Sequence, residues 1–123
     1  MKDIKKFEEA IRNEVKDLKA EGINRTMFWA YRDTKDTGAA DLNFHEVIWE
    51  EDIEPIVKTC REEGIEQITI SSTFSGLTET LWKLTEHGCT IVGMKKVPMR
   101  YTEYDRETGK THTAYAPALI IRL

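Results

Sequence analysis

Hydroxyl and glycine residues are concentrated in the run Ser71-Ser72-Thr73-Phe74-Ser75-Gly76. The run follows a β-branched segment that predicts a strand and precedes a segment with helical periodicity. Such a loop lies at the carboxyl edge of a parallel sheet, where the free N–H groups of a helix start attract anions. The candidate chemistry is binding of a phosphorylated small molecule by Ser71, Ser72, Thr73, Ser75 and Gly76, with charge from Lys95 and Lys96 in the next strand. Alternatively, the hydroxyls only cap the helix and satisfy the turn.

The segment Ser75–Leu81, followed by Gly88–Gly93, resembles the phosphate loop of sugar isomerase (SIS) domains. That family's spacing from Ser-Gly to Thr-Leu is one residue longer than here, and nothing upstream in this chain matches it. The resemblance therefore adds only a phosphate ligand as an expectation for this loop.

The carboxyl-terminal part of the chain is the second place where residue types suggest a function. Residues 89–123 hold six basic side chains and three acidic ones, and the basic side chains alternate with tyrosines in a predicted hairpin. Charge and ring stacking are used to contact nucleic acids or acidic proteins. The candidate interaction surface is Arg100, Tyr101, Tyr104, Arg106, Lys110 and Tyr115. In the alternative interpretation, these are ordinary strand residues and edge protection.

Other groups that could do chemistry match no strong motif. Asp33, Asp36 and Asp41 are expected in one loop and could hold Mg²⁺, but their spacing matches no EF-hand or other strong metal motif, and the alternative is an ordinary solvated loop. The three histidines are far apart and lack zinc-ligand spacing, so we predict no metal site and no cofactor. Cys60 and Cys89 lie in apolar patterns, which predicts two reduced, buried thiols. A cysteine–histidine nucleophile pair stays open as an alternative, because such partners need only be close in space.

The elements that would position these residues alternate along the chain in the order αβαβαββ. We expect a helix with Ile4, Phe7, Ile11, Val15 and Leu18 on one face, ended by Gly22, and a buried strand at 26–32. A polar loop at 33–41, an irregular segment at 42–48 and a helix from about residue 50 to Gly64 follow. Next come a strand at 65–71, a helix capped by Ser75 that buries Leu77, Leu81, Trp82 and Leu84, and a strand at 89–97.

The carboxyl-terminal segments 99–104 and 112–123 predict an antiparallel hairpin around a turn at 105–110. The fold class is therefore α/β, a single compact domain over residues 1–123. Its mixed sheet is expected to have a parallel core from the segments near 26–32, 65–71 and 89–97 and the antiparallel hairpin at its end.

Composition limits the classes of function. The chain has 123 residues, 22 acidic and 18 basic, for a net charge of −4, which argues against general nucleic-acid binding. No apolar run approaches the roughly 20 residues that a membrane span needs, and the amino terminus lacks the apolar region of a signal peptide. We therefore expect a cytoplasmic protein that does not enter membranes.

Several segments together resemble a family of small uncharacterised proteins from gut clostridia, often encoded near mobile elements. The matching segments are 27–32, 46–49, 68–75 and 120–123. The resemblance implies no activity, substrate or catalytic residue, and favours an accessory protein. With no acid, base and nucleophile at recognisable spacing, we predict a non-enzymatic interaction or regulatory module with an unknown protein partner. The alternative is a protein or enzyme that binds a phosphorylated metabolite at the 71–76 loop.

Overall fold

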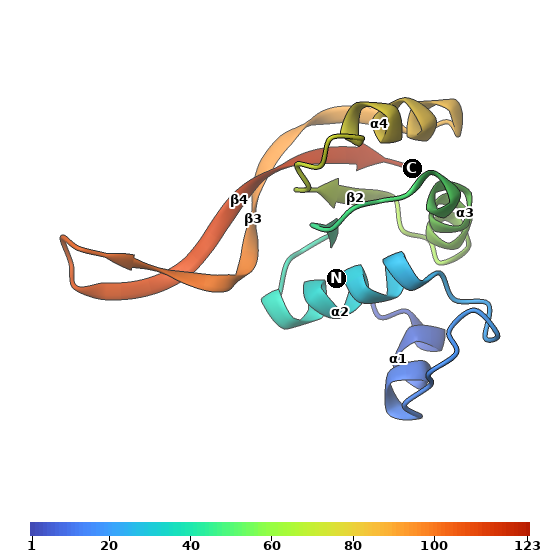
Figure 1. Cartoon of the computed structure of the whole chain (residues 1–123), viewed down its shortest axis with the longest axis horizontal. Coiled ribbons are helices and arrows are strands. Elements are labelled where there is room, and N and C mark those ends of the chain that lie inside the picture. Colours follow the sequence, from blue (N-terminus) through green and yellow to red (C-terminus); the bar gives the residue numbers. More distant parts are fainter.

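Four helices and a four-stranded sheet make up the computed structural model, which describes all 123 residues (Figure 1). The helices are α1 (Lys5–Arg12), α2 (Arg25–Thr37), α3 (Ile53–Glu62), preceded by the short 3-10 helix η1 (Glu50–Asp52), and α4 (Leu77–Glu86). The strands are β1 (Leu42–Phe44), β2 (Gln67–Ile70), β3 (Thr90–Asp105) and β4 (Lys110–Arg122). The predicted α/β class and the single compact domain are confirmed.

The sheet is mixed and has the strand order β1-β2-β4-β3. β1 and β2 are parallel, while β4 is antiparallel to both β2 and β3. β2 and β3 therefore run in the same direction, as the crossover through α4 predicts, but β4 lies between them. The mixed sheet, a parallel pair within it and the carboxyl-terminal hairpin are confirmed. Of the three segments expected in the parallel core, 65–71 does form a parallel pair, but with 42–44, because 26–32 is helical and β4 separates 89–97 from it.

The segment predicted as a buried strand at 26–32 is helical and belongs to α2. Asn24 caps the helix by accepting a hydrogen bond from the backbone N–H of Met27, and Gly38 ends it in the left-handed conformation, at φ 71°. The buried residues Met27, Phe28, Tyr31 and Thr34 recur with helical spacing. Asp33 and Asp36 consequently lie on a helix and not in the polar loop expected at 33–41.

The first helix is shorter than its apolar stripe predicts. α1 ends at Arg12, because Glu14 adopts a left-handed conformation and the N–H of Val15 bonds back to the carbonyl of Ala10. This is the pattern of a Schellman cap. Leu18 is nevertheless buried, from the loop that follows. The apolar spacing therefore predicted the burial of Leu18 correctly, although this residue lies beyond the end of the helix.

A main core of 21 buried residues joins the helices to one face of the sheet. Ile68, Ile70 and Ile121 contribute from the two central strands, and Leu84 contributes from α4. α1 is attached through Phe7, whose ring makes edge-to-face contacts with Phe28 and Tyr31 of α2. Leu81 and Leu77 are only partly buried against this core, and Trp82 is exposed, so the predicted apolar face of α4 is shifted toward Thr80 and Leu84.

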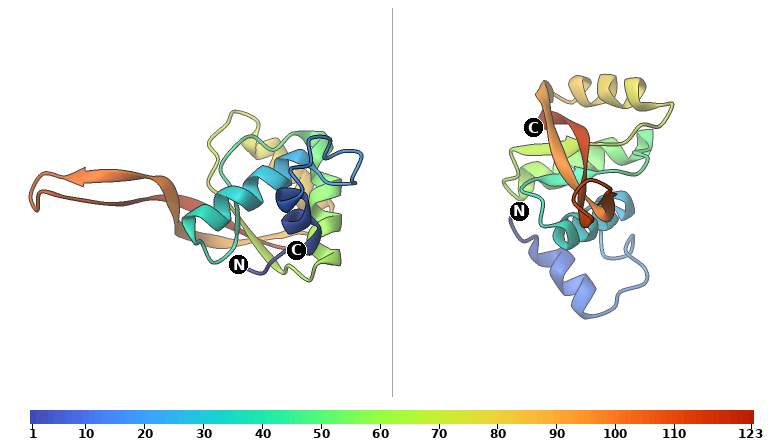
Figure 2. Two further views of the ribbon diagram at one scale, coloured as in Figure 1. Left: turned by 90° about the horizontal axis from the view of Figure 1, so that it is seen from below. Right: turned by 90° about the vertical axis from the view of Figure 1, so that its left-hand side faces the viewer.

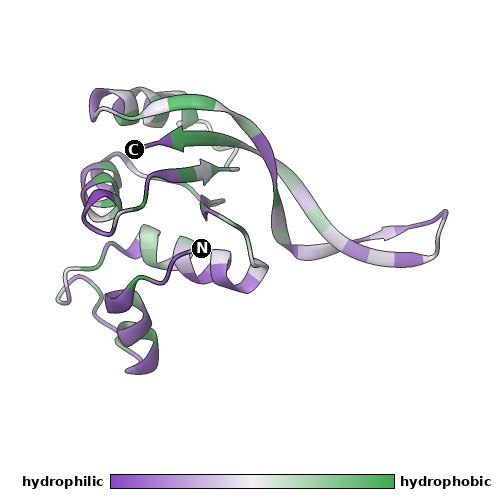
Figure 3. Ribbon diagram, turned by 180° about the vertical axis from the view of Figure 1, so that it is seen from behind, coloured by the Kyte–Doolittle hydropathy of each residue, from purple (hydrophilic) through white to green (hydrophobic).

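β3 and β4 form a twisted ribbon that extends far beyond the helices (Figure 2). Its root is closed by a separate small cluster of Val97, Met99, Ala114 and Ala118. Colouring by hydropathy shows apolar residues where the strands join the sheet and mostly polar or neutral ones toward the turn (Figure 3). The register shifts between Pro98 and Thr102, at the point where the ribbon leaves the body.

Candidate functional site

The Ser71–Gly76 loop lies where predicted, between β2 and α4, but its first two hydroxyls point into the protein. The hydroxyl of Ser72 donates to the backbone carbonyls of Phe44, at 3.1 Å, and Glu46, at 2.6 Å. Both Ser71 and Ser72 are buried. These bonds attach the loop to the end of β1, so the two serines hold neighbouring strand ends together.

The remaining loop hydroxyls, of Thr73 and Ser75, are exposed. The predicted cap at Ser75 is wrong, because Gly76 occupies the N-cap position of α4 and no side chain caps the helix. Of the two lysines expected to add charge, Lys96 is exposed, while Lys95 forms an ion pair with Asp41 at 2.5 Å. Thr73, Ser75 and Gly76 thus stay accessible at this edge, with less positive charge than the sequence suggests.

A buried polar network connects the loop to β1 and α2. Asn43 is its centre: its side chain accepts a hydrogen bond from the hydroxyl of Thr69 at 2.8 Å and donates one to the hydroxyl of Ser71 at 3.0 Å. The backbone N–H of Asn43 donates to the hydroxyl of Thr34. No buried side-chain nitrogen or oxygen lacks a partner in this structure, so the network is fully satisfied.

Ser71 also contacts a histidine, which sequence spacing did not reveal. Nδ1 of His45 lies 2.9 Å from the Ser71 hydroxyl, within hydrogen-bond reach of a nucleophile and its base. However, Ser71 is only 5% exposed and its oxygen already accepts a bond from Asn43. A substrate carbonyl cannot approach such an oxygen without breaking the network, and the pair therefore acts to hold the β1 and β2 ends together.

The six residues of the candidate interaction surface all lie on the ribbon and are exposed. Tyr101, Tyr104 and Tyr115 are between 55% and 64% exposed. Arg100, at the root, pairs with two carboxylates of α2, Asp33 at 2.9 Å and Asp36 at 3.8 Å. Arg106 lies in the turn and Lys110 directly follows it. The structure therefore places Tyr101 and Tyr104 on the projecting arm and Tyr115 at its root, opposite Pro98, and one of the basic residues attaches the arm to the body.

The three aspartates that could have held Mg²⁺ are used in ion pairs instead. Asp33 and Asp36 face Arg100, and Asp41 faces Lys95 and accepts a hydrogen bond from Gln67. No group of three or more histidine, cysteine, aspartate or glutamate side chains is arranged in a way that could hold a metal ion. The carboxylates link α2 and the start of β1 to the ribbon.

Both cysteines are free and buried, as predicted. Burial raises the pKa of the Cys60 thiol to about 12, and the nearby Cys89 adds to this shift. Burial likewise raises the pKa of Cys89. Because the thiolate is the reactive form, these shifts make both side chains poor nucleophiles at neutral pH.

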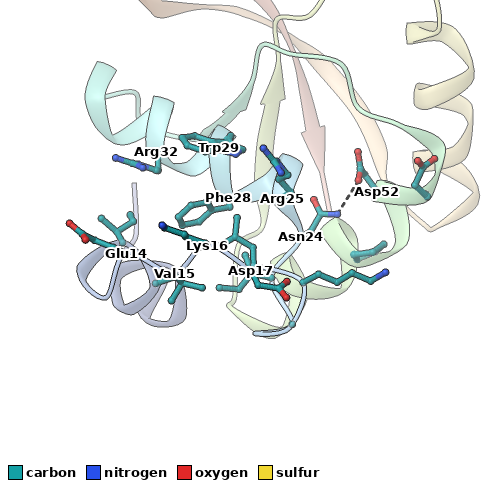
Figure 4. A pocket seen from close by; sticks show the side chains of 18 residues that line it. Glu14, Val15, Lys16, Asp17, Asn24, Arg25, Phe28, Trp29, Arg32 and Asp52 are labelled. Carbon is teal, nitrogen blue, oxygen red and sulfur yellow. Dashed lines mark hydrogen bonds between the residues drawn. The ribbon is translucent and has the colours of Figure 1, made fainter.

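The largest cavity, of about 1040 Å³, lies between the segment after α1 and the exposed side of α2 (Figure 4). Glu14 and Lys16 line it from that segment, and Arg25 and Trp29 line it from α2. Asp52 borders the cavity but is 8% exposed and accepts a hydrogen bond from the side chain of Asn24. Acidic and basic residues alternate around the opening, so the cavity carries no charge preference that identifies a ligand.

The residues that sequence reasoning missed are the three tryptophans. Trp29 is expected in a buried strand, Trp82 on a buried helix face and Trp49 directly after the irregular segment 42–48. These side chains are 46%, 66% and 59% exposed, respectively. Large aromatic side chains are buried in most proteins, so composition alone gave no signal of this exposure.

Comparison with known families matches residues 26–120 to a domain of unknown function, DUF7698. This chain belongs to that family. The DUF7698 match covers most of the described fold, from the start of α2 almost to the end of β4. It agrees with the predicted resemblance to an uncharacterised family. No curated protein and no solved structure matches the chain. No helix is long and apolar enough to cross a membrane.

Proposed function

We propose that this protein is a non-enzymatic interaction module whose contact element is the tip of the β3–β4 ribbon, residues 101–113. The observation that supports this is the projection of the ribbon beyond every helix (Figure 2). All but one of these residues are exposed, and Asp105 is half-buried. A two-stranded ribbon without a covering layer is marginally stable in water, so it contributes little to the stability of the body.

The side chains on the tip suit a protein partner. Tyrosine is enriched in protein interfaces, because it offers a large ring and a hydroxyl at a low cost in conformational entropy. Tyr101 and Tyr104 present such rings to solvent. The tip carries three acidic residues, Glu103, Asp105 and Glu107, and two basic ones, Arg106 and Lys110, a formal charge of −1. A surface without excess positive charge argues against nucleic acid as the partner.

A cytoplasmic accessory role near clostridial mobile elements is the finer part of this proposal. It is supported by the sequence resemblance and by the two free, buried cysteines, since disulfides are rare in the cytosol. The alternative, binding of a phosphorylated metabolite at the 71–76 loop, has less support. Ser71 and Ser72 form hydrogen bonds, and Lys95 forms an ion pair, with other residues of the protein.

Photo-cross-linking in cells tests the proposal. A photoreactive amino acid replaces Tyr104 on the tip or, as a matched control on an exposed helix position, Glu9 of α1. We expect a discrete adduct from position 104 and none from position 9. A second copy of this chain in that adduct would make the arm a self-association element. Identical adduct patterns from both positions, or none from either, would contradict the proposal.

A further inference from the structure

The three exposed tryptophans come from different elements and border two neighbouring grooves. One groove, of about 440 Å³, has Trp29 of α2 and Trp49 among its walls. The other, of about 740 Å³, has Trp49 and Trp82 of α4 among its walls. Trp49 and Val47 line both grooves, so Trp49 is the ridge between them. We call this surface the tryptophan track; none of its tryptophans lies on the ribbon.

The walls of the track are apolar between its aromatic ridges. Ala30, Phe44 and Val47 line the first groove. Ile48, Ile53 and Phe74 line the second, together with Val47. A row of exposed aromatic rings above apolar walls is rare on the surface of a protein that has no partner. The track is therefore shaped to receive apolar side chains between rings.

The rim of the track is acidic. Its ionisable side chains are four carboxylates, two cations and one imidazole: Asp33, Glu46, Glu50, Glu79, Arg25, Lys83 and His45. Counting carboxylates, arginine and lysine, the lining side chains carry a formal charge of −2, and Arg100, which pairs with Asp33 from outside the two grooves, reduces it to −1. Lys83 is paired with Glu50, at 3.5 Å, and Asp33 is paired with Arg100, while Glu46 and Glu79 form no ion pair. This charge disfavours phosphate-bearing ligands and favours a cationic one.

We propose that the tryptophan track binds an extended, proline-rich peptide segment that carries lysine or arginine. Proline rings on a polyproline II helix fit slots between aromatic ridges, and the preformed helix loses little entropy on binding. The basic residues of the peptide would face Glu46 and Glu79 at the rim. This is a second binding surface, separate from the tip of the ribbon.

Nuclear magnetic resonance of the tryptophan indole N–H groups tests the proposal on the intact chain. The probe is an oligoproline peptide of about ten residues flanked by arginines. A glycine-serine peptide with the same arginines, an oligoproline flanked by glutamates and a short oligothymidylate are the comparisons. We expect the arginine-flanked oligoproline to move the indole signal of Trp49 together with that of Trp29 or Trp82, and the comparisons to move them far less.

Two variants locate the binding. Trp49→Ala removes the shared ridge and should weaken binding at least about tenfold, as loss of a central aromatic does. Its fold should persist, because the side chain is 59% exposed and its backbone N–H still donates to Asp52. Met94→Ala, at a similarly exposed apolar side chain of β3, is the matched control and should bind normally. The pair Glu46→Gln and Glu79→Gln should weaken binding by roughly threefold, and more at low salt than at high salt.

Several results would overturn the proposal. One is the absence of any indole shift at peptide concentrations of about 5 mM, which corresponds to negligible affinity. Another is equal shifts from the glycine-serine peptide, which would mean attraction by charge alone. Shifts caused by oligothymidylate would assign the track to nucleic acid, and normal binding by Trp49→Ala would place the peptide elsewhere.

Discussion

The two ends of the β3–β4 ribbon are formed by the same two strands but differ in what stabilises them. At the body end, Ile121 is fully buried between neighbouring strands and helices. At the far end, Tyr104 is 64% exposed and pairs only with the opposite strand. Burial against a covering layer stabilises the first end, and nothing comparable stabilises the second. Residues at the body end therefore contribute to the stability of the fold, whereas residues at the tip can contribute to binding instead.

The sharpest way to test this contrast is to shorten one side chain at each end. Ile121→Ala should lower the free energy of unfolding by about 2–5 kcal/mol, because it leaves a cavity in the main core. Tyr104→Ala should change it by less than about 0.5 kcal/mol. Urea unfolding followed by circular dichroism measures both. Similar losses from the two variants would mean that the tip is covered in solution.

The buried polar network gives the next largest effect. Asn43→Ala removes the acceptor of the Thr69 hydroxyl and a donor to Ser71, and leaves buried polar groups unpaired. We expect a loss of about 1–3 kcal/mol. Asn13→Ala, at an exposed position after α1, is the control and should be nearly neutral. A neutral Asn43→Ala would show that water replaces the amide, and the network would then not hold the β1 and β2 ends.

Much of the architecture could be predicted from sequence, and the failures have physical causes. The helix at 53–62, the strand at 67–70 and the carboxyl-terminal hairpin follow from periodicity and turn residues. α2 was mistaken for a strand because its aromatic residues have high β propensity. The helical spacing of its buried residues, the cap at Asn24 and the end at Gly38 indicate a helix. The aromatic composition of one short segment favoured a strand instead.

The candidate sites were less predictable, because they depend on which side chains point inward. Ser71 and Ser75 are the same residue type in the same loop, yet one is buried in a network and the other is exposed. Trp82 has the spacing of a core residue but lies on the outer side of α4. Tertiary packing decides both outcomes, and a single sequence contains no direct record of it.

The body should also respond to alkaline pH in a way that the tip does not. Burial raises the pKa of Cys60 to about 12 in the folded state, above its ordinary value. The unfolded thiol ionises first as the pH rises, so the stability from this group is complete below about pH 9 and is lost as the pH approaches the folded pKa. We expect a decline of up to about 1.4 kcal/mol per pH unit from this thiol.

Chemical unfolding at several alkaline pH values measures that slope. Cys60→Ala should reduce the slope, whatever its effect on stability at neutral pH. Thiol titration offers a second check, because both cysteines should react slowly until denaturant is added. Fast labelling of either thiol in the native protein would show that the core opens more readily than its burial indicates.

A small effect is also expected from removing residues 103–112, which make up most of the tip. Thr102 and Thr113 are directly paired, so Asn-Gly can replace residues 103–112 and close the ribbon with a two-residue turn. Because the deleted residues pack on nothing in the body, the free energy of unfolding should change by less than about 1 kcal/mol. The amide spectrum of the body should stay the same, while the cross-link expected at position 104 cannot form because that residue is absent.

In the full-length chain, amides of the tip should exchange with solvent faster than those paired with β2, because opening the isolated ribbon breaks few apolar contacts. A large loss of stability on shortening would mean that the tip folds back onto the body. The ribbon would then be part of the fold, and the division between a folding end and a binding end would fail.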